Sequence, residues 1–256
     1  MARIYPLFSS SKGNSTYIGN KNRGILIDDG ISFSRLKKAF DVNDIPLEAV
    51  KAVFITHEHS DHIKGLSILT KKLRVPVYAQ AYTLEILGDR INSEGFEIKD
   101  HEDICDMRIS CFPTPHDTKE SCGYRIEFED GEKCAVCTDL GYVPQNVLNN
   151  LLGLDAVLIE SNYDVEMLRN GPYEYYLKTR IFSKNGHLSN DDCGELVKML
   201  VESGTEKIIL GHLSQENNTP ELADRTVERH LAGYKRNSDY MLSVAPVETS
   251  GGFVAF

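Results

Sequence analysis

The chain has 256 residues, 41% of them hydrophobic and 26% charged, a composition that supports a sizeable core and argues against global disorder. Its net charge of −10 argues against a general nucleic-acid coat protein, because phosphate binding rests on clustered Lys and Arg. No stretch approaches the roughly 20 apolar residues that span a bilayer, and residues 1–10 lack the apolar run of a signal peptide, so we expect a soluble, cytoplasmic protein with no membrane partner.

The first hundred residues alternate between strand and helix patterns. Apolar and β-branched runs predict strands at 3–8, 16–20, 24–30, 49–56 and 75–80. Apolar residues at helical spacing predict helices at 32–42, 64–73 and 81–91. Small polar residues predict a turn over residues 9–15.

The remainder of the chain is first rich in strands and then alternates again. Strands are predicted at 107–115, 121–130, 132–140, 154–161, 206–212, 240–245 and 251–256. Helices are predicted at 143–153, 190–204 and 219–234, the second of them capped by Ser189 and stopped by Gly204. No linker divides the chain, so residues 1–256 are expected to form a single domain.

Five titratable side chains follow the predicted strand 49–56 within six positions: His57, Glu58, His59, Asp61 and His62. Such a cluster has no packing rationale and indicates metal binding. The first and second histidines can reach one ion together from an extended segment, and Asp61 with His62 can begin a second site. Imidazole and carboxylate groups suit Zn²⁺, Mn²⁺ or Fe.

Three more polar residues follow strand-like runs at their carboxyl ends: His116, Asp139 and His212. Loops at strand ends are where sheet folds assemble sites from distant segments. Together with the cluster after residue 56, these side chains suffice for two metal ions. A carboxylate can bridge two ions about 3.5–4 Å apart, and Asp139 is the candidate.

These residues carry a resemblance to the metallo-β-lactamase superfamily, whose H-x-H-x-D-H signature matches THEHSDH at 56–62. The rest of its pattern is present in LIDDG at 26–30, TPHD at 114–117, CTDLG at 137–141 and LGHLS at 210–214. The resemblance covers essentially the whole chain. It implies an α+β fold, namely a four-layer αββα sandwich of two mixed β-sheets with helices on the outside, and a dinuclear metal centre at the sheet edge.

The resemblance also assigns the metal ligands. It implies that one ion is held by His57, His59 and His116, and the other by Asp61, His62 and His212. Asp139 would bridge the ions, and Asp28 would orient a ligand by hydrogen bonding. A hydroxide held between the two ions would be the nucleophile.

A further motif, NGHLSN at 185–190, resembles the additional histidine motif of tRNase Z and related phosphodiesterases. The likeness implies that His187 protonates the leaving oxygen and that Glu160 hydrogen-bonds this histidine. The expected catalytic residues are these two together with Asp61 of the metal-binding signature. An ordinary surface histidine is the alternative for His187.

Longer stretches resemble the YycJ/WalJ branch of the superfamily: SSSKGNSTYI at 9–18, ESNYD at 160–164, GPYEYYLKTRI at 171–181 followed by NGHLSN at 185–190, and LGHLSQENN at 210–218. This branch implies a bacterial, cytoplasmic DNA exonuclease of the 5′-to-3′ type. Serines stand where two glycines are commonly expected before SKGN, a departure that leaves the metal pattern intact.

Substrate contacts are expected at two places. Ser11, Lys12 and Asn14 could hold a phosphate, unless their segment is a plain hairpin loop. The second place combines basic residues for the nucleic-acid backbone with tyrosines for base stacking, unless it is a solvated face with core tyrosines. Its members are Lys178, Arg180 and Lys184 with Tyr173, Tyr175 and Tyr176.

Two other functions stay open from the sequence. A small-molecule phosphodiesterase, or a thioester or lactone hydrolase, would fit the acidic surface better. A non-catalytic metal-binding regulatory partner would need neither Glu160 nor His187. The sequence leaves open the metal, the choice of DNA over RNA, the polarity of cleavage and the oligomeric state. Cys134 and Cys137 form a C-x-x-C, but without a second such pair we expect core cysteines.

Overall fold

The computed structural model describes residues 2–256. Contacts within the chain divide it into two compact units. The first unit extends to Cys111 and adds Ile126–Glu132 and Pro246–Phe256, and the second comprises Phe112–Arg125 and Lys133–Ala245. Each unit has its own hydrophobic core of strand and helix side chains.

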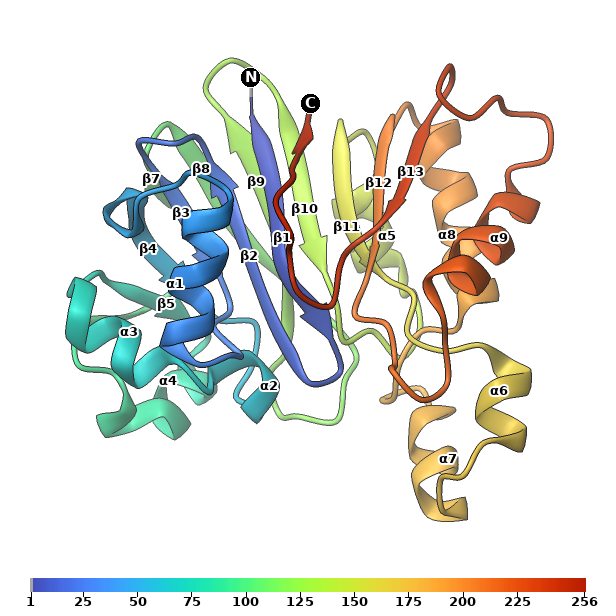
Figure 1. Cartoon of the computed structure of the whole chain (residues 1–256), viewed down its shortest axis with the longest axis horizontal. Coiled ribbons are helices and arrows are strands. Elements are labelled where there is room, and N and C mark those ends of the chain that lie inside the picture. The colour runs from blue at the N-terminus through green and yellow to red at the C-terminus, as the bar shows by residue number, and fades with distance from the viewer. Residues whose placement is uncertain (1) are drawn as a thin grey trace. The chain divides into compact units, whose positions relative to one another are not determined.

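One seven-stranded mixed sheet belongs to the first unit and has the order β14-β1-β2-β3-β4-β5-β6 (Figure 1). Its strands are β1 (Arg3–Ser10), β2 (Gly13–Gly19), β3 (Gly24–Ile27), β4 (Val50–Phe54), β5 (Val77–Ala79), β6 (Gly95–Glu97) and β14 (Val254–Ala255). The pairs from β14 to β3 are antiparallel, and those from β3 to β6 are parallel. Parallel neighbours end at the same edge, so β3 and β4 deliver the residues that follow them to one place.

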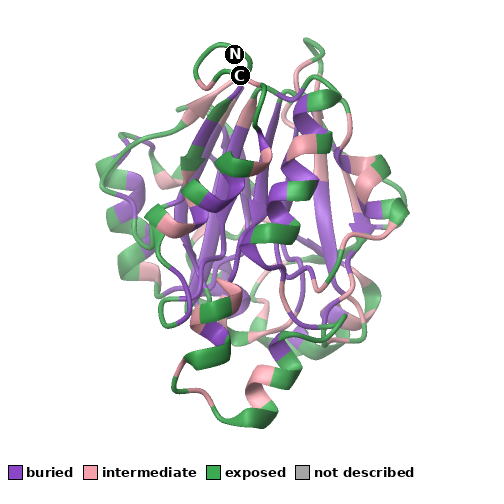
Figure 2. Ribbon diagram, turned by 90° about the vertical axis from the view of Figure 1, so that its right-hand side faces the viewer, coloured by how far each residue is buried: buried purple, intermediate pink, exposed green. Residues whose placement is uncertain are grey.

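The helices of the first unit are amphipathic and cover this sheet. They are α1 (Phe33–Val42), α2 (Ser60–Ile63), α3 (Leu66–Leu73) and α4 (Ala81–Leu87), with 3₁₀ turns at Leu47–Ala49 and Gly88–Arg90. In α1, the side chains of Leu36, Ala39 and Phe40 are buried at helical spacing and join the core of the unit. Figure 2, which views the molecule from the side of the second unit's helices, likewise shows buried and exposed residues alternating along the helices that face the viewer.

The other seven-stranded sheet has the order β13-β12-β11-β10-β9-β8-β7. Its strands are β7 (Glu102–Ile104), β8 (Met107–Pro113), β9 (Cys122–Phe128), β10 (Lys133–Cys137), β11 (Ala156–Glu160), β12 (Lys207–Gly211) and β13 (Met241–Val244). Strands β10 to β13 are parallel, and β10, β11 and β12 consist mostly of buried apolar residues, whereas the edge strand β13 is partly exposed. The residues that follow β10, β11 and β12 therefore gather at one carboxyl edge.

The second unit contains five helices: α5 (Gln145–Leu151), α6 (Val165–Asn170), α7 (Tyr175–Ile181), α8 (Asn190–Glu202) and α9 (Pro220–His230). Helix α8 begins as predicted, because the Ser189 hydroxyl accepts a hydrogen bond from the Asp192 amide. It is followed by Gly204 with φ +102°, a conformation that favours glycine. Helix α9 has Thr219 as its cap and proline at its first position.

Most predicted elements are confirmed, and the differences involve short segments. Only residues 11 and 12 separate β1 from β2, so the predicted turn over 9–15 is narrower and its flanks are strand. Helices α2, α6 and α7 and strands β6 and β7 were not predicted. Among residues 2–256, no disulfide joins the six cysteines, and both members of the C-x-x-C are buried. Across the same range, none of the helices is long and apolar enough to cross a membrane.

Candidate active site

The first unit gathers its predicted ligands at the carboxyl ends of β3 and β4. Ile27 pairs with Phe54 in the parallel register, and the amide of Asp28 donates to the carbonyl of Phe54 at 2.9 Å. Asp28 therefore lies beside the segment that carries the histidines. Its carboxylate is buried and accepts hydrogen bonds from the amide and the hydroxyl of Thr56, both at 2.9 Å.

The same carboxylate fixes the ring of His62. Nδ1 of His62 lies 2.8 Å from Oδ2 of Asp28. A carboxylate can only accept, so Nδ1 must carry the proton and Nε2 the lone pair that a metal ion would bind. Burial of this pair leaves the ring one orientation, which is the arrangement expected for a metal-binding histidine.

The remaining residues of the cluster lie close to this ring. The ring centroid of His57 is 4.2 Å from that of His62 and 4.6 Å from that of His59. Nε2 of His62 lies 3.4 Å from Oδ2 of Asp61. His59 is in extended backbone before α2, whereas Asp61 and His62 belong to the first turn of that helix. The unpredicted helix α2 thus turns the second pair of ligands away from the extended segment.

The structure separates the three residues predicted to bind phosphate near the N-terminus. Ser11 and Lys12 are exposed in the turn between β1 and β2. Asn14 is buried, and its Nδ2 lies 3.5 Å from Oδ2 of Asp61 and 3.2 Å from Nε2 of His62. Asn14 is therefore next to the predicted ligands, and substrate binding by any of the three stays a prediction.

The second unit contains five predicted site residues, three of which lie at the carboxyl ends of its parallel strands. Asp139 follows β10, Glu160 ends β11 and His212 follows β12, while His187 comes from the segment before α8. Ligand atoms of these four residues all lie within 4.8 Å of one another. His116, which follows β8, has its Nε2 3.5 Å from Oδ1 of Asp139.

Glu160 connects most of these groups. Its Oε1 accepts from Nδ1 of His187 at 2.8 Å and from Nδ1 of His212 at 2.7 Å. Its Oε2 accepts from the amides of Leu140 at 2.8 Å and Leu188 at 3.0 Å. Burial alone raises the pKa of Glu160, but the charge of His187 and the hydrogen bonds from both histidines outweigh it and hold the pKa below its usual range. Glu160 is therefore a carboxylate that fixes both rings with Nε2 directed away from it.

His116 is held in a similar way by a backbone carbonyl. Its Nδ1 donates to the carbonyl of Gly186 at 3.0 Å, so Nε2 is the nitrogen available to a ligand. Burial lowers the pKa of His116 despite the nearby Asp139 carboxylate. The neutral imidazole that results is the form that binds metal ions.

Three of the site residues have an unusual backbone conformation. Asp28, Asp139 and His212 have φ of 59°, 58° and 56°, in the left-handed region that residues other than glycine rarely adopt. Asp28 and His212 come directly after a strand of the parallel part of a sheet, and Asp139 comes two residues after one. Such conformations cost about 1–3 kcal/mol each and tend to occur at functional sites, where the surrounding contacts maintain them.

The predicted nucleic-acid contacts lie on and near α7. Nζ of Lys178 donates to the carbonyls of Arg169 and Gly171, and Arg180 forms an ion pair with Asp117. Tyr175 and Tyr176 are 85% and 73% exposed, whereas Tyr173 packs against a small core cluster. Lys178 and Arg180 thus have partners within the protein, whereas Tyr175 and Tyr176 are accessible. Substrate binding by these residues stays a prediction.

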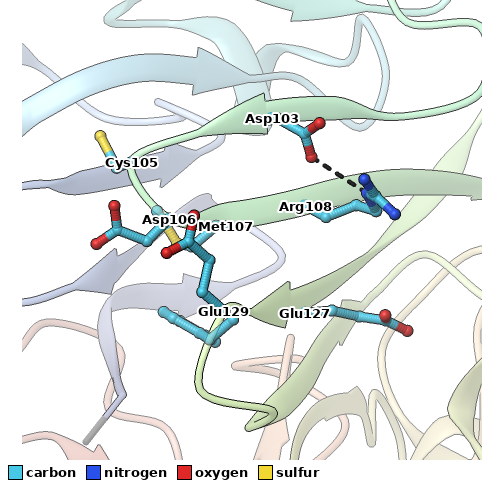
Figure 3. A pocket seen from close by; sticks show the side chains of 8 residues that line it. Asp103, Cys105, Asp106, Met107, Arg108, Glu127 and Glu129 are labelled. Atoms are coloured by element: carbon cyan, nitrogen blue, oxygen red, sulfur yellow. Dashed lines mark hydrogen bonds and ion pairs between the residues drawn. The ribbon is translucent and has the colours of Figure 1, made fainter.

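A separate pocket of about 470 Å³ lies in the first unit, next to the β7–β8 hairpin (Figure 3). It contains none of the predicted site residues. Its charged side chains are mostly acidic, and Arg108 donates to Asp103 at 3.2 Å across its rim. The pocket is lined by Asp103, Cys105, Asp106, Met107, Arg108, Glu127, Phe128 and Glu129.

Sequence reasoning missed two residues that touch the predicted ligands. The hydroxyl of Thr56 lies 3.0 Å from Nδ1 of His57. The side-chain Nδ2 of Asn162 donates to the carbonyl of His212 at 2.7 Å. Thr56 begins the histidine motif, and Asn162 lies within ESNYD, so both were in stretches already singled out. The available signal was their position, since Thr56 is adjacent to His57 and Asn162 is two positions from Glu160.

These arrangements fit divalent metal ions. Each unit presents imidazole and carboxylate groups, and the Nδ1 atoms of His62, His116 and His212 are occupied by hydrogen bonds that leave Nε2 as the donor. Histidines and aspartates at strand ends of two mixed sheets define a metal-dependent hydrolase. The profile of the beta-lactamase superfamily domain matches residues 23–213, and the chain belongs to this superfamily.

Relatives place the chain more closely, in the YycJ/WalJ family. It is 36% identical over 231 residues to the exodeoxyribonuclease YycJ of Bacillus anthracis, covering 88% of this chain and 87% of that protein. It is 37% identical over 235 residues to the exodeoxyribonuclease WalJ of Streptococcus pneumoniae D39, with the same coverage. The resemblance seen in the sequence motifs is thereby confirmed.

Solved structures confirm the fold. The metallo-β-lactamase fold protein YhfI from Bacillus subtilis superposes with a TM-score of 0.73 and 15% identity, over 97% of this chain and 98% of that one. Human tRNase Z, short form, superposes with a TM-score of 0.66 and 13% identity, over 100% and 99%. The α+β metallo-β-lactamase fold predicted from the sequence is therefore correct.

Proposed function

We propose that this protein is a metal-dependent DNA exonuclease that works from the 5′ end. The observation that carries the proposal is the hydrogen bond between His187 and Glu160 at 2.8 Å, because such a pair can protonate a poor leaving group. Two relatives that share more than a third of their residues with the chain are named exodeoxyribonucleases. The sugar oxygen that leaves in phosphodiester hydrolysis is such a poor leaving group.

The ligand assignment follows the superfamily pattern. We propose two divalent ions, zinc, manganese or iron, held by His57, His59, Asp61, His62, His116, Asp139 and His212. When bound, the ions would supply hydroxide near neutral pH and neutralise charge on the phosphoryl oxygens. Asp28 and Glu160 would keep the rings of His62 and His212 oriented with Nε2 toward the ions.

His187 would act as the general acid. Because Glu160 accepts from Nδ1, the proton to be delivered is the one on Nε2 of the protonated ring. The hydrogen bond to the carboxylate also fixes the orientation of the ring. His187 is also partly exposed, with 17% of its side chain accessible, so a leaving oxygen can reach it, whereas the His212 side chain is almost completely buried. The difference in accessibility is why we assign His187 as the general acid and His212 as a metal ligand.

The polymer would be held partly by α7. Tyr175 and Tyr176 offer two accessible rings for base stacking, which is worth about 1–3 kcal/mol per base and tolerates any sequence. Helix α7 leads directly to the acid, because the amide of His187 donates to the carbonyl of Ile181 at its last residue. DNA as substrate also fits the cytoplasmic location expected from the sequence, which stays a prediction.

The test is hydrolysis of labelled single- and double-stranded DNA and RNA by the metal-loaded protein. Successive release of nucleotides from a 5′-labelled DNA end supports the proposal, as does loss of hydrolysis after chelation. Turnover of a thioester, a lactone or a small phosphodiester without turnover of DNA would contradict it and favour the small-molecule alternative. Metal binding without any hydrolysis would favour a regulatory partner.

A further inference from the structure

A buried network of hydrogen bonds joins three of the motifs that resemble the YycJ/WalJ branch. Asn190 and Asn218 exchange two side-chain hydrogen bonds, at 2.9 and 2.8 Å. The hydroxyl of Ser161 donates to Oδ1 of Asn190 at 2.7 Å, and Nδ2 of Asn218 donates back to the carbonyl of Ser161 at 2.9 Å. All three side chains are buried in the second unit. The network fixes the segments that follow β11, precede α8 and follow β12.

Asn162 is the point at which this network reaches the site. Its backbone amide donates to the carbonyl of Leu188 at 2.9 Å, next to His187. Its carbonyl accepts from the amide of Ser214 at 2.8 Å and from Nδ2 of Asn218 at 3.1 Å. The backbone of Asn162 thus ties together the segments that carry the proposed acid and the proposed ligand His212.

The side chain of Asn162 acts on His212 directly. Nδ2 of Asn162 donates to the carbonyl of His212 at 2.7 Å and lies 3.3 Å from its Nδ1. Because Nδ1 already donates to Glu160, the carbonyl is the true acceptor. His212 has φ of 56°, so its carbonyl points where an ordinary strand would not place it. The hydrogen bond from Asn162 therefore depends on the left-handed conformation of His212 and would be lost if this residue returned to an extended conformation.

We propose that Asn162 is a positioning residue that holds the strained peptide of His212 and thereby aims its ring at the metal ion. The role rests on the proposed function, since it presupposes His212 as a ligand. Asn162 itself touches neither substrate nor metal. Groups that orient a metal ligand typically contribute about 10–100-fold to metal affinity, and the same loss is expected when this amide is removed.

The test measures metal affinity of the metal-free protein by competition with a chromophoric chelator, using Zn²⁺ and Mn²⁺ separately. Asn162→Ala removes the donor, and Asn162→Asp keeps the shape but replaces the donor by an acceptor. Both variants are expected to bind one of the two ions about 10–100-fold more weakly while keeping the circular dichroism spectrum of the wild type. Asn217→Ala is the matched control, because this neighbouring buried amide has no side-chain hydrogen bond among residues 2–256. Its metal affinity is expected to equal that of the wild type.

A second measurement separates positioning from general support of the fold. In a His212→Ala background, Asn162→Ala is expected to cause no further loss of metal affinity, because its effect passes through that ring. Independently of metal, the Nδ1 proton of His212 in nitrogen-15 NMR spectra is expected to lose its protection from exchange in Asn162→Ala. Additive losses in the double variant, or unchanged affinity and unchanged protection in the single variants, would overturn the role. A wild-type protein that binds no divalent ion would instead overturn the proposed function, and this role with it.

Discussion

Glu160 shows how much of the site could be predicted residue by residue. Its partnership with His187 was expected from the motif, and the structure places the two at 2.8 Å. The second bond from the same oxygen to His212 could not be predicted, because Glu160 and His212 are 52 positions apart and meet only when β11 and β12 pair. The left-handed backbone at Asp139 and His212 was also outside the reach of sequence patterns, since neither residue is a glycine.

General-acid catalysis by His187 makes a prediction that depends on the leaving group. His187→Ala is expected to slow DNA hydrolysis by about 10²–10⁴-fold, the usual contribution of a general acid. A nucleotide p-nitrophenyl ester, whose leaving group needs no proton, should lose much less. Steady-state rates on both substrates provide the measurement. His101→Ala, at an exposed histidine, serves as control. An equal loss on both substrates would assign His187 to something other than proton transfer.

The buried carboxyl of Asp29 predicts an unusual dependence of stability on pH. Its two oxygens have no hydrogen-bond partner among the described residues, and burial, helped by the charge of Asp28, raises its pKa from 3.8 to about 8. Between these values the folded chain keeps a proton that the unfolded chain has released. The unfolded state therefore binds fewer protons, and stability falls as pH rises through this window.

Asp29→Asn removes that titration and should raise the melting temperature at pH 8. An increase of at least about 3 °C is expected, since 1 kcal/mol corresponds to roughly 2–4 °C in a protein of this size. The gain should shrink toward pH 4, where the wild-type carboxyl is protonated in both states. Calorimetry across this range provides the measurement, with exposed Asp41→Asn as control. A gain that does not change with pH would contradict the buried neutral carboxyl.

Helices with clear boundary signals could be predicted, and short ones could not. Helix α8 has a serine cap, an apolar face and a glycine stop, and it lies within two residues of expectation. Helices α6 and α7 have six and seven residues and too few turns to show a period. Their stability comes from packing of Leu168, Ile181 and Tyr163, which only the folded chain brings together.

The cap of α8 should contribute to stability without contributing to metal binding. Ser189→Ala leaves the amide of Asp192 without its acceptor and is expected to cost about 0.5–2 kcal/mol. Thr219→Ala at the start of α9 removes an equivalent bond to Leu222 and should cost a similar amount. Urea unfolding of both variants provides the comparison, together with metal content. A loss of metal in Ser189→Ala alone would show that the cap also positions the site.

If the exposed tyrosine rings of α7 stack on bases, removing them should weaken binding of DNA without affecting turnover of a small substrate. Tyr175→Ala and Tyr176→Ala are expected to weaken binding of single-stranded DNA by about 5-fold or more each, because each removes a stacking partner worth about 1–3 kcal/mol. Tyr→Phe at either position should retain affinity. Turnover of a nucleotide p-nitrophenyl ester should be unchanged. Fluorescence anisotropy of labelled oligonucleotides measures this, and equal affinities of the alanine and wild-type proteins would exclude the surface.

Considered as a chain, the protein divides its predicted site residues between two compact units. Asp28, His57, His59, Asp61 and His62 belong to the first, and His116, Asp139, Glu160, His187 and His212 to the second. The sequence could predict most of these residues because they lie in loops that follow strand-like runs, whereas Glu160 and His187 were predicted from the resemblance of their motifs to tRNase Z. That residues 1–256 act as a single domain, with all seven ligands around two ions, stays a prediction.

Metal content and DNA hydrolysis, measured on the same preparations of wild type and Asp139→Ala, test the proposed site most directly. We predict two divalent ions per wild-type chain and degradation of DNA from its 5′ end. The variant, lacking the bridging carboxylate, should retain fewer ions and lose at least about 100-fold in rate, more than the loss typical of residues that only orient a ligand. An Asp139→Ala protein with wild-type metal content and wild-type hydrolysis would contradict the account.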